Sequence, residues 1–308
     1  MNIKSFSEKF PTEEAIIEHF VKVRYKTGIC CPHCGCKKVY HRHTKIKVFQ
    51  CSECLRDFSI FTNTIFEKSS TDLRKWFTAI KCMLNGKKGI SALQLQREID
   101  VTYKTAWRML RQIRSAMGNT ENEKIFTAIV EIDETYVGGK PRKQSKQTKD
   151  KSDKDKSDKN KRGRGTLKTP VIGLKERNSS KVYAKVALPN KAGKKLTGKQ
   201  LLRIIEQVCK DKTLVISDEF RSYGILDRKD SNFFHLVVNH SIGEYSRNGI
   251  HTNGIESFWA LLKRGIYGMY HQVSEKYLQF YVNEFCFRLN NRKNEDSFDT
   301  LLGCCVLA

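Results

Sequence analysis

Four cysteines in two short pairs carry the clearest chemistry in this 308-residue chain. Cys31 and Cys34 form one Cys-x-x-Cys turn, Cys51 and Cys54 form a second, and 16 residues lie between the two turns. Two such turns that face each other supply four thiolates in a tetrahedron, which is the coordination geometry that Zn²⁺ prefers. The spacing therefore predicts a structural zinc ribbon over about residues 28–60, stabilised by its metal.

Other cysteines and histidines near this set are less suited to bind the metal. Cys30 and Cys36 flank the first turn, but only Cys31 and Cys34 have the two-residue gap. Because four thiolates fill a zinc site, we expect the neighbouring histidines to be surface residues. These histidines are His33, His41 and His43. Disulfide bonds are the competing interpretation, and we disfavour them because the first residues of the chain have no secretory character.

Two aspartates form a second pattern that could do chemistry. Asp133 closes the apolar run 129–133, and Asp218 closes the apolar run 214–218. Reactive groups of open α/β sheets gather beyond strand ends, and two carboxylates that meet there repel each other unless a cation lies between them. The pattern predicts a site for Mg²⁺ or Mn²⁺ that supports phosphoryl transfer. The alternative is that each aspartate is an ordinary turn or capping residue.

A third acid is expected from a helix within residues 251–264. Glu256 and Lys263 are seven residues apart, so they share one helix face. On that face a carboxylate can hold a metal while the lysine contacts a phosphate. Asn253 lies one turn before Glu256 on nearly the same face, and it remains a second candidate for the third position. The alternative is that both charged residues are surface residues and the apolar residues between them face the core.

Helical elements between residues 71 and 118 are expected to position a DNA-binding surface. Thr71, Ser91 and Thr102 are candidate N-caps, and the helices break at residues 100–102. The last helix has an apolar face that consists of Ala106, Leu110, Ile113 and Met117. Its opposite face carries Lys104, Arg108 and Arg111. A tight helix–turn–helix with a basic second helix favours DNA docking, and the alternative is a basic face that is merely solvated.

The charge of the chain favours a polyanionic partner. Lys and Arg number 57 against 33 Asp and Glu, which gives a formal net charge of +24. Residues 140–168 contain 13 Lys or Arg and four Asp, and we expect them to form a loop that follows phosphates or, alternatively, only a solvated spacer. No apolar run reaches the 18 residues of a membrane span, so we expect no membrane partner. We expect the protein to be cytoplasmic and associated with the bacterial nucleoid.

The order of the elements after residue 125 predicts a mixed α/β sheet with flanking helices. We divide the chain into an N-terminal helix and zinc ribbon at 1–62, a helix–turn–helix region at 63–120, a catalytic domain at 121–295 and a tail at 296–308. The basic low-complexity loop at 140–168 is an insertion in the third of these parts.

Nearly the whole chain outside 140–168 resembles one family. The matching segments are the ribbon with 56–59, then 73–77, 103–110, 130–139, 217–218, 251–264 and 281–288. Together they resemble the DDE-type bacterial insertion-sequence transposases of the ISXO type, which are related to the Merlin elements. The resemblance implies a ribonuclease-H-like catalytic domain in which Asp133 and Asp218 bind metal. It also implies Glu256 or Asn253 at the third position, with Lys263 as the accompanying basic residue.

We therefore expect a transposase that binds the ends of an insertion sequence, cleaves the strand and joins the 3′ end to target DNA. Its expected cofactors are structural Zn²⁺ and catalytic Mg²⁺ or Mn²⁺, and its expected partner is double-stranded DNA, on which it forms a homo-oligomer. The residues expected to contact DNA are Lys104, Arg108, Arg111 and Arg264. The competing interpretations are a catalytically inactive DNA-binding regulator and a ribonuclease-H-like enzyme that cleaves RNA.

Overall fold

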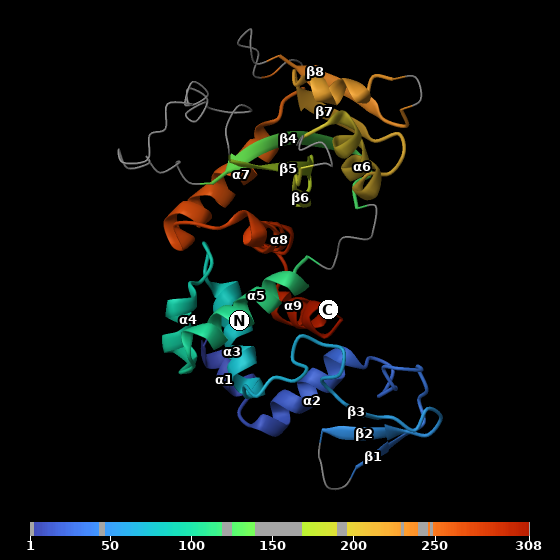
Figure 1. Cartoon of the computed structure of the whole chain (residues 1–308), viewed down its shortest axis with the longest axis vertical. Helices are drawn as coiled ribbons and strands as arrows, with labels where there is room; N and C mark the ends of the chain where they lie inside the picture. Colours follow the sequence, from blue (N-terminus) through green and yellow to red (C-terminus); the bar gives the residue numbers. More distant parts are fainter. Residues whose placement is uncertain are drawn as a thin grey trace, which may run out of the picture. The chain divides into compact units, whose positions relative to one another are not determined.

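The protein is described from a computed structural model, in which the chain forms two compact units (Figure 1). Unit 1 comprises Met1–Thr120 with Asn291–Ala308, and unit 2 comprises Glu121–Asn290. The structure describes residues 3–42, 47–118, 125–138, 168–189, 196–228, 231–239, 246 and 249–307. His43 and the basic loop at 140–168, except Lys168, lie outside the described residues.

Unit 1 is built around helices from both ends of the chain. Its helices are α1 (Ile3–Lys9), α2 (Glu13–Arg24), α3 (Leu73–Asn85), α4 (Ala92–Ile99), α5 (Tyr103–Ala116) and α9 (Ser297–Val306). The rings of Phe10, Phe77 and Phe298 meet in the core, with centroids 5.2, 5.7 and 5.5 Å apart. The sequence predicts a tail at residues 296–308, but this segment contains α9, whose apolar residues pack against α2, α3 and α5.

The predicted ribbon is a small antiparallel sheet within unit 1. Strand β1 (Val39–His41) pairs with β2 (Val48–Cys51), which pairs with β3 (Asp57–Ser59). Phe58 is buried, and the ring of Phe49 stacks on it at 5.8 Å. So small a cluster buries little apolar area, which is consistent with a ribbon that depends on a metal.

Helices α4 and α5 form the predicted helix–turn–helix. The hydroxyls of Ser91 and Thr102 cap them, each accepting a hydrogen bond from the backbone N–H three residues further on, at 3.1 and 3.3 Å. Asp100 makes the turn between the helices in a left-handed backbone conformation, with φ of 48°. Helix α3 is capped by Asp72 instead of the predicted Thr71, because the carboxylate next to the helix accepts the N-terminal hydrogen bond.

Unit 2 contains a five-stranded mixed sheet with the strand order β6–β5–β4–β7–β8. Its strands are β4 (Ile129–Val137), β5 (Thr169–Glu176), β6 (Val182–Val186), β7 (Leu214–Asp218) and β8 (Phe234–Val238). β5 pairs antiparallel with both β4 and β6, whereas β7 pairs parallel with both β4 and β8. This arrangement confirms the predicted mixed sheet.

Helices cover both faces of this sheet (Figure 1). The helical elements of unit 2 are α6 (Gly198–Val208), the 3₁₀ turn η4 (Arg221–Ile225), α7 (Asn253–Gly265), the π-helical turn η6 (Ile266–Tyr270) and α8 (Glu275–Asn290). Ile132 of β4 packs in a core with α6, and Val137 packs with α7 and α8, because side chains alternate between faces along a strand. Within the described chain, no helix combines the length and the apolar character that crossing a membrane requires.

Candidate active site and metal centres

The four cysteines predicted to bind zinc lie together in the ribbon. Cys31 Sγ is 3.6 Å from Cys54 Sγ, and Cys34 Sγ is 3.5 Å from Cys51 Sγ. All four sulfurs lie within 4.8 Å of one another. Zn–S bonds of about 2.3 Å in a tetrahedron separate the sulfurs by about 3.8 Å, so this donor set fits Zn²⁺.

The crowding of the sulfurs makes their joint ionisation unfavourable without a cation. The backbone N–H of Cys54 lowers the pKa of Cys51 to about 6. A hydrogen bond from the backbone of Cys36 favours the thiolate of Cys34, but contacts with the neighbouring thiols outweigh it and raise the pKa of Cys34 to about 12. A divalent metal that binds all four residues as thiolates removes this conflict.

The neighbouring cysteines and histidines of the described ribbon lie outside the four-sulfur group. Cys36 Sγ accepts a hydrogen bond from a backbone N–H at 3.3 Å. Cys30 lines a separate cavity of about 720 Å³ beside the end of α2. His33 is exposed, and the ring of His41 contacts that of Phe49 with centroids 5.1 Å apart.

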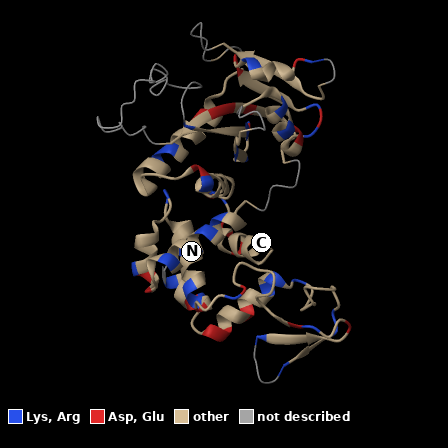
Figure 2. Cartoon of the chain, in the orientation of Figure 1, with Lys and Arg blue, Asp and Glu red and all other residues tan. Residues whose placement is uncertain are grey.

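Asp133 and Asp218 lie at the same level of two parallel strands, β4 and β7. The pairing aligns Glu131 with Ile216, so the residues two positions further along are Asp133 and Asp218. The sequence predicts that both aspartates lie at strand ends. Asp218 does end β7, but Asp133 lies in the middle of β4, which continues to Val137 beside β5 alone. The acidic stretch of β4 is red in Figure 2.

A third carboxylate, which was not predicted from the sequence, lies beside the two aspartates. Oxygens of Asp133, Glu134 and Asp218 lie within 4.8 Å of one another. The hydroxyl of buried Tyr223 donates a hydrogen bond to Glu134 Oε2 at 3.1 Å. Burial, followed by the charge of Glu134, raises the pKa of Tyr223 well above its usual range, so the phenol stays a donor. The position of Glu134 directly after Asp133 was the available signal.

The carboxyl group of Asp133 accepts a hydrogen bond from a tryptophan and has a raised pKa. Its Oδ2 accepts a hydrogen bond from Trp259 Nε1 of α7 at 3.0 Å. Burial, and then the charges of Glu134 and Asp218, raise the pKa of Asp133 to about 7. A crowded set of oxygen ligands that cannot all ionise alone fits a hard divalent cation such as Mg²⁺ or Mn²⁺.

The other residues predicted for this site lie on α7. Glu256, Trp259 and Lys263 share one helix face, so Glu256 and Lys263 flank the tryptophan that reaches Asp133. Glu256 is exposed and accepts a hydrogen bond from the hydroxyl of Thr252 at 2.9 Å. It lies outside the three-carboxylate group. Lys263 is half-buried, whereas Asn253 and Arg264 are exposed, as Glu256 is.

The predicted apolar face of α5 is buried, whereas the residues of its basic face range from half-buried to exposed. The apolar residues, each at most 3 % exposed, are Ala106, Leu110, Ile113 and Met117. Lys104 and Arg111 are exposed, and the Arg111 guanidinium lies 5.7 Å from the ring centre of Trp107. Arg108 is half-buried, and its Nη2 donates to Ser69 Oγ at 3.4 Å.

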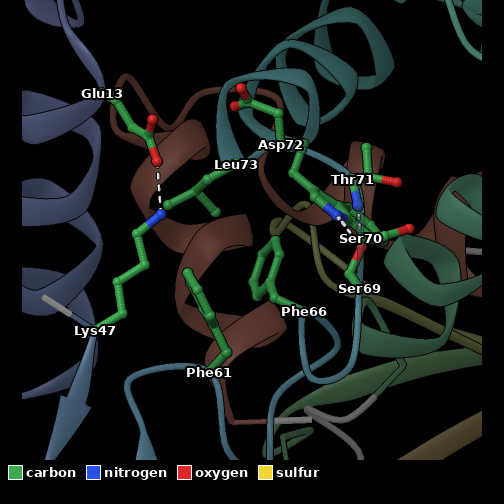
Figure 3. Close-up of a pocket in the computed structure, with 10 residues that line it drawn as sticks. Glu13, Lys47, Phe61, Phe66, Ser69, Ser70, Thr71, Asp72 and Leu73 are labelled. Carbon is green, nitrogen blue, oxygen red and sulfur yellow. Dashed lines mark hydrogen bonds and ion pairs between the residues drawn. The ribbon is translucent and has the colours of Figure 1, made fainter. Parts of the chain in front are cut away.

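A cavity of about 220 Å³ lies beside the N-terminus of α3 (Figure 3). Phe61, Phe66 and residues 69–72 line it. The ammonium of Lys47 on its rim pairs with Glu13 at 2.6 Å, so this cation is already balanced. The metal-ligating groups found in the described residues lie elsewhere, and the cavity is therefore a weaker candidate for the active site than the three carboxylates of unit 2.

Comparison with known families matches both parts of the chain. Residues 126–290 match the ISXO2-like transposase domain, and residues 11–57 match the transposase zinc-ribbon domain. The first match includes the five-stranded sheet and α7, and the second includes all four zinc-site cysteines. Together with the mixed sheet, these matches confirm the predicted ribonuclease-H-like class and the zinc ribbon.

Individual relatives agree with the family match. A protein in the transposable element ISH50 of Halobacterium salinarum is 32% identical over 287 residues, which cover 91% of each chain. A transposase-like protein of Haemophilus influenzae is 32% identical over 121 residues, or 39% of this chain and 90% of that protein. The Mos1 strand transfer complex is similar at 12% identity and a TM-score of 0.24, covering 70% of this chain and 76% of that chain. So low a TM-score supports no inference.

Replacing Cys51 by serine is expected to remove the zinc and unfold the ribbon while unit 2 stays folded. The reason is that a structural zinc supplies much of the folding free energy of so small a sheet. Metal analysis should find about one zinc per wild-type chain and almost none in Cys51→Ser. Cys36→Ser is the matched control and should keep its zinc. Loss of zinc from this variant would contradict the assignment of the four ligands.

The raised pKa of Asp133 predicts that Mn²⁺ binding to unit 2 strengthens as the pH rises toward 7. Below that pH a proton must leave Asp133 before the metal binds, so the affinity should fall by up to about tenfold per pH unit. In the metal-free protein, the same shift means that the stability contributed by the protonated carboxyl is lost as the pH rises through 7.

The measurement is a Mn²⁺ titration followed by electron paramagnetic resonance between pH 6 and 8. The exposed Asp211 in the variant Asp211→Asn serves as control and should reproduce the wild-type profile. An affinity that is constant from pH 6 to 7 would contradict the expected proton competition.

Proposed function

This chain belongs to the family of ISXO2-like transposases, and from that premise we propose that it binds the ends of an insertion sequence, cleaves a DNA strand and joins the 3′ end to target DNA. The observation that carries the proposal is the group of three carboxylates, Asp133, Glu134 and Asp218, in the family's catalytic domain. Carboxylate groups of this kind bind the divalent cations that serve phosphoryl transfer.

Asp133 and Asp218, with Glu256 as the third acid, are proposed to hold the catalytic cation. Mg²⁺ or Mn²⁺ bound there supplies the positive charge that activates an attacking oxygen and stabilises a leaving oxygen. Trp259 keeps the carboxyl of Asp133 oriented, and Lys263 on the same helix face binds a phosphate of the reacting strand. Asn253 and Glu134 compete with Glu256 for the third position.

Two in-line phosphoryl transfers account for the proposed reaction. Water attacks the phosphodiester at an element end, the bond from phosphorus to the 3′ oxygen breaks, and a 3′-hydroxyl and a 5′-phosphate result. That hydroxyl then attacks a target phosphodiester, forms a new P–O bond and releases a 3′-hydroxyl of the target. Both steps exchange one oxygen for another at phosphorus, so one site serves both. Because two element ends must be joined, we propose that a homo-oligomer acts on the DNA.

The helix–turn–helix of unit 1 is proposed to bind double-stranded DNA. Its second helix, α5, exposes Lys104 and Arg111, and Arg264 lies exposed in the last turn of α7 in unit 2. The formal net charge of +24 supports a polyanionic partner, because neutralising phosphates releases counterions. Zinc is structural in this proposal, since sulfur fills all four of its positions.

Asp133→Asn and Asp218→Asn are expected to abolish cleavage of terminal-repeat DNA while leaving DNA binding intact. Each amide keeps the shape of the side chain and loses the charge that holds the cation. Strand nicking in Mg²⁺ or Mn²⁺ measures cleavage, and Asp211→Asn is the control. A wild-type protein that binds terminal DNA but never nicks it would instead favour the catalytically inactive regulator.

The same assay ranks the candidates for the third ligand. If Glu256 holds metal, Glu256→Gln should be as damaging as the aspartate changes, and Glu134→Gln and Asn253→Ala should be milder. The reverse order would move the third position to whichever residue proved essential. Lys263→Ala should slow cleavage without lowering the Mn²⁺ affinity, because the lysine contacts the strand instead of the cation.

Arg111→Ala should weaken binding to terminal-repeat DNA and lower its dependence on salt by about one counterion. Arg108→Ala should have a smaller effect, because this half-buried side chain also bonds to Ser69. Fluorescence anisotropy at several salt concentrations measures both slopes, and Arg203→Ala, an exposed change on α6, controls for net charge. Equal slopes in all three variants would show that α5 makes no specific phosphate contact.

A further inference from the structure

The buried carboxylate of Glu131, which is outside the three-carboxylate group, joins β4 to the start of α7 by hydrogen bonding. The side chain of Glu131 is only 3% exposed, and its Oε2 accepts a hydrogen bond from the backbone N–H of Ile255 at 3.0 Å. Arg177 Nε donates to Glu131 Oε1 at 3.0 Å. His251 Nδ1 lies 3.3 Å from the same oxygen. Glu131 thus satisfies an N-terminal amide of α7 that has no partner within the helix.

Arg177, which follows β5, extends this contact to the segment that leads into α7. Its guanidinium donates to the carbonyl oxygens of Gly249 and His251, the second at 2.6 Å. Its backbone N–H donates to the carbonyl of Ile129, at the start of β4, at 2.9 Å. Arg177 therefore links β4, the strand that carries Glu131, to the residues immediately before α7.

The spacing of the contacts along β4 matches the spacing along α7. Glu131 and Asp133 project from the same side of the strand, about 6.8 Å apart, because each strand residue advances about 3.4 Å. Their partners Ile255 and Trp259 are four residues apart, a rise of about 6 Å along a helix. A Cβ on Gly254 would lie 2.6 Å from Glu131 Oε2, so the helix start lies directly on the carboxylate.

We propose that Glu131, held by Arg177, is a positioning residue that fixes the register of α7 along β4. By fixing this register it aims Glu256 and Lys263 toward the three-carboxylate group. The proposal rests on the proposed function of that group and adds a residue that acts through the helix. In a protein without the Glu131 carboxylate, the hydrogen bond from Trp259 to Asp133 would still join α7 to β4.

Glu284 provides a matched control because it is another fully buried glutamate of unit 2 with an arginine partner. Its carboxylate accepts hydrogen bonds from Arg288 at 2.7 Å and from Tyr270 at 3.0 Å, but it lies on α8, outside the contact between α7 and β4. Glu131→Gln and Glu284→Gln each neutralise one buried carboxylate at almost no change in volume. Arg177→Lys and Arg177→Met then separate the charge of Arg177 from its planar geometry.

The experiment combines hydrogen exchange of full-length protein with Mn²⁺ binding and with Mn²⁺-dependent nicking of terminal-repeat DNA. In Glu131→Gln, the amides of residues 252–259 should exchange at least about tenfold faster, because a helix-start contact is lost. The Mn²⁺ affinity should fall, and kcat should fall by about 100-fold with KM for DNA unchanged, as misplacement of a reacting group predicts. Arg177→Met should behave in the same way, and Arg177→Lys should recover part of the loss.

Glu284→Gln should leave the exchange of α7, the Mn²⁺ affinity and kcat at wild-type values. The proposal is overturned if Glu131→Gln has the wild-type rates of hydrogen exchange in α7 and the wild-type affinity for Mn²⁺. It is also overturned if Glu284→Gln speeds hydrogen exchange in α7 as much as Glu131→Gln does. If the wild-type protein does not nick terminal DNA, the proposed function fails separately, while hydrogen exchange and Mn²⁺ affinity still decide whether Glu131 positions α7.

Discussion

The parallel pairing of β4 with β7 brings Asp133 and Asp218 to one level of the sheet, and the rest of the site compensates for the charge gathered there. Two unit charges about 4 Å apart repel by roughly 4 kcal/mol at the effective dielectric constant of a protein surface. In the metal-free protein, burial and then the charges of Glu134 and Asp218 raise the pKa of Asp133. Hydrogen bonds from Trp259 and Tyr223 hold two of the carboxyls in place, and a divalent cation would remove the repulsion itself.

The close approach of α7 to the sheet follows from one missing side chain. Gly173 of β5 is the register partner of Asp133, and a Cβ at that position would lie 2.5 Å from the ring of Trp259. The tryptophan therefore packs directly on the backbone of β5 and reaches the aspartate on the neighbouring strand. A larger residue at 173 would push α7 away from Asp133. The distance between the sheet and α7, the helix that carries Glu256, therefore depends on the glycine at this position.

Features that depend on neighbours in sequence were predictable. The four cysteines, the caps Ser91 and Thr102 and the apolar face of α5 are set by short spacings, and the structure has them as expected. The extent of β4 was not predictable, because its polar second half is held in the strand by pairing with β5. Glu134 was not predicted for the same reason, because the apolar run in the sequence ends at Asp133.

Features that depend on contacts between distant parts of the chain also could not be predicted from the sequence. The last helix, α9, is ordered by packing against α2, α3 and α5, contacts that span almost the whole chain. The contact between Glu131 and the start of α7 joins residues 124 positions apart. The assignment of Glu256 to the metal remains a prediction, because its side chain lies outside the three-carboxylate group and only its helix face was expected from spacing.

The most direct test of the account is a crystal structure of the full chain grown with Mn²⁺, with anomalous scattering used to distinguish manganese from zinc. The account predicts a manganese peak within coordination distance of both Asp133 and Asp218, and a separate zinc peak among the four cysteines. A zinc-loaded ribbon with no manganese at the two aspartates, at Mn²⁺ concentrations that support nicking, would contradict the central claim that these aspartates form the catalytic metal site.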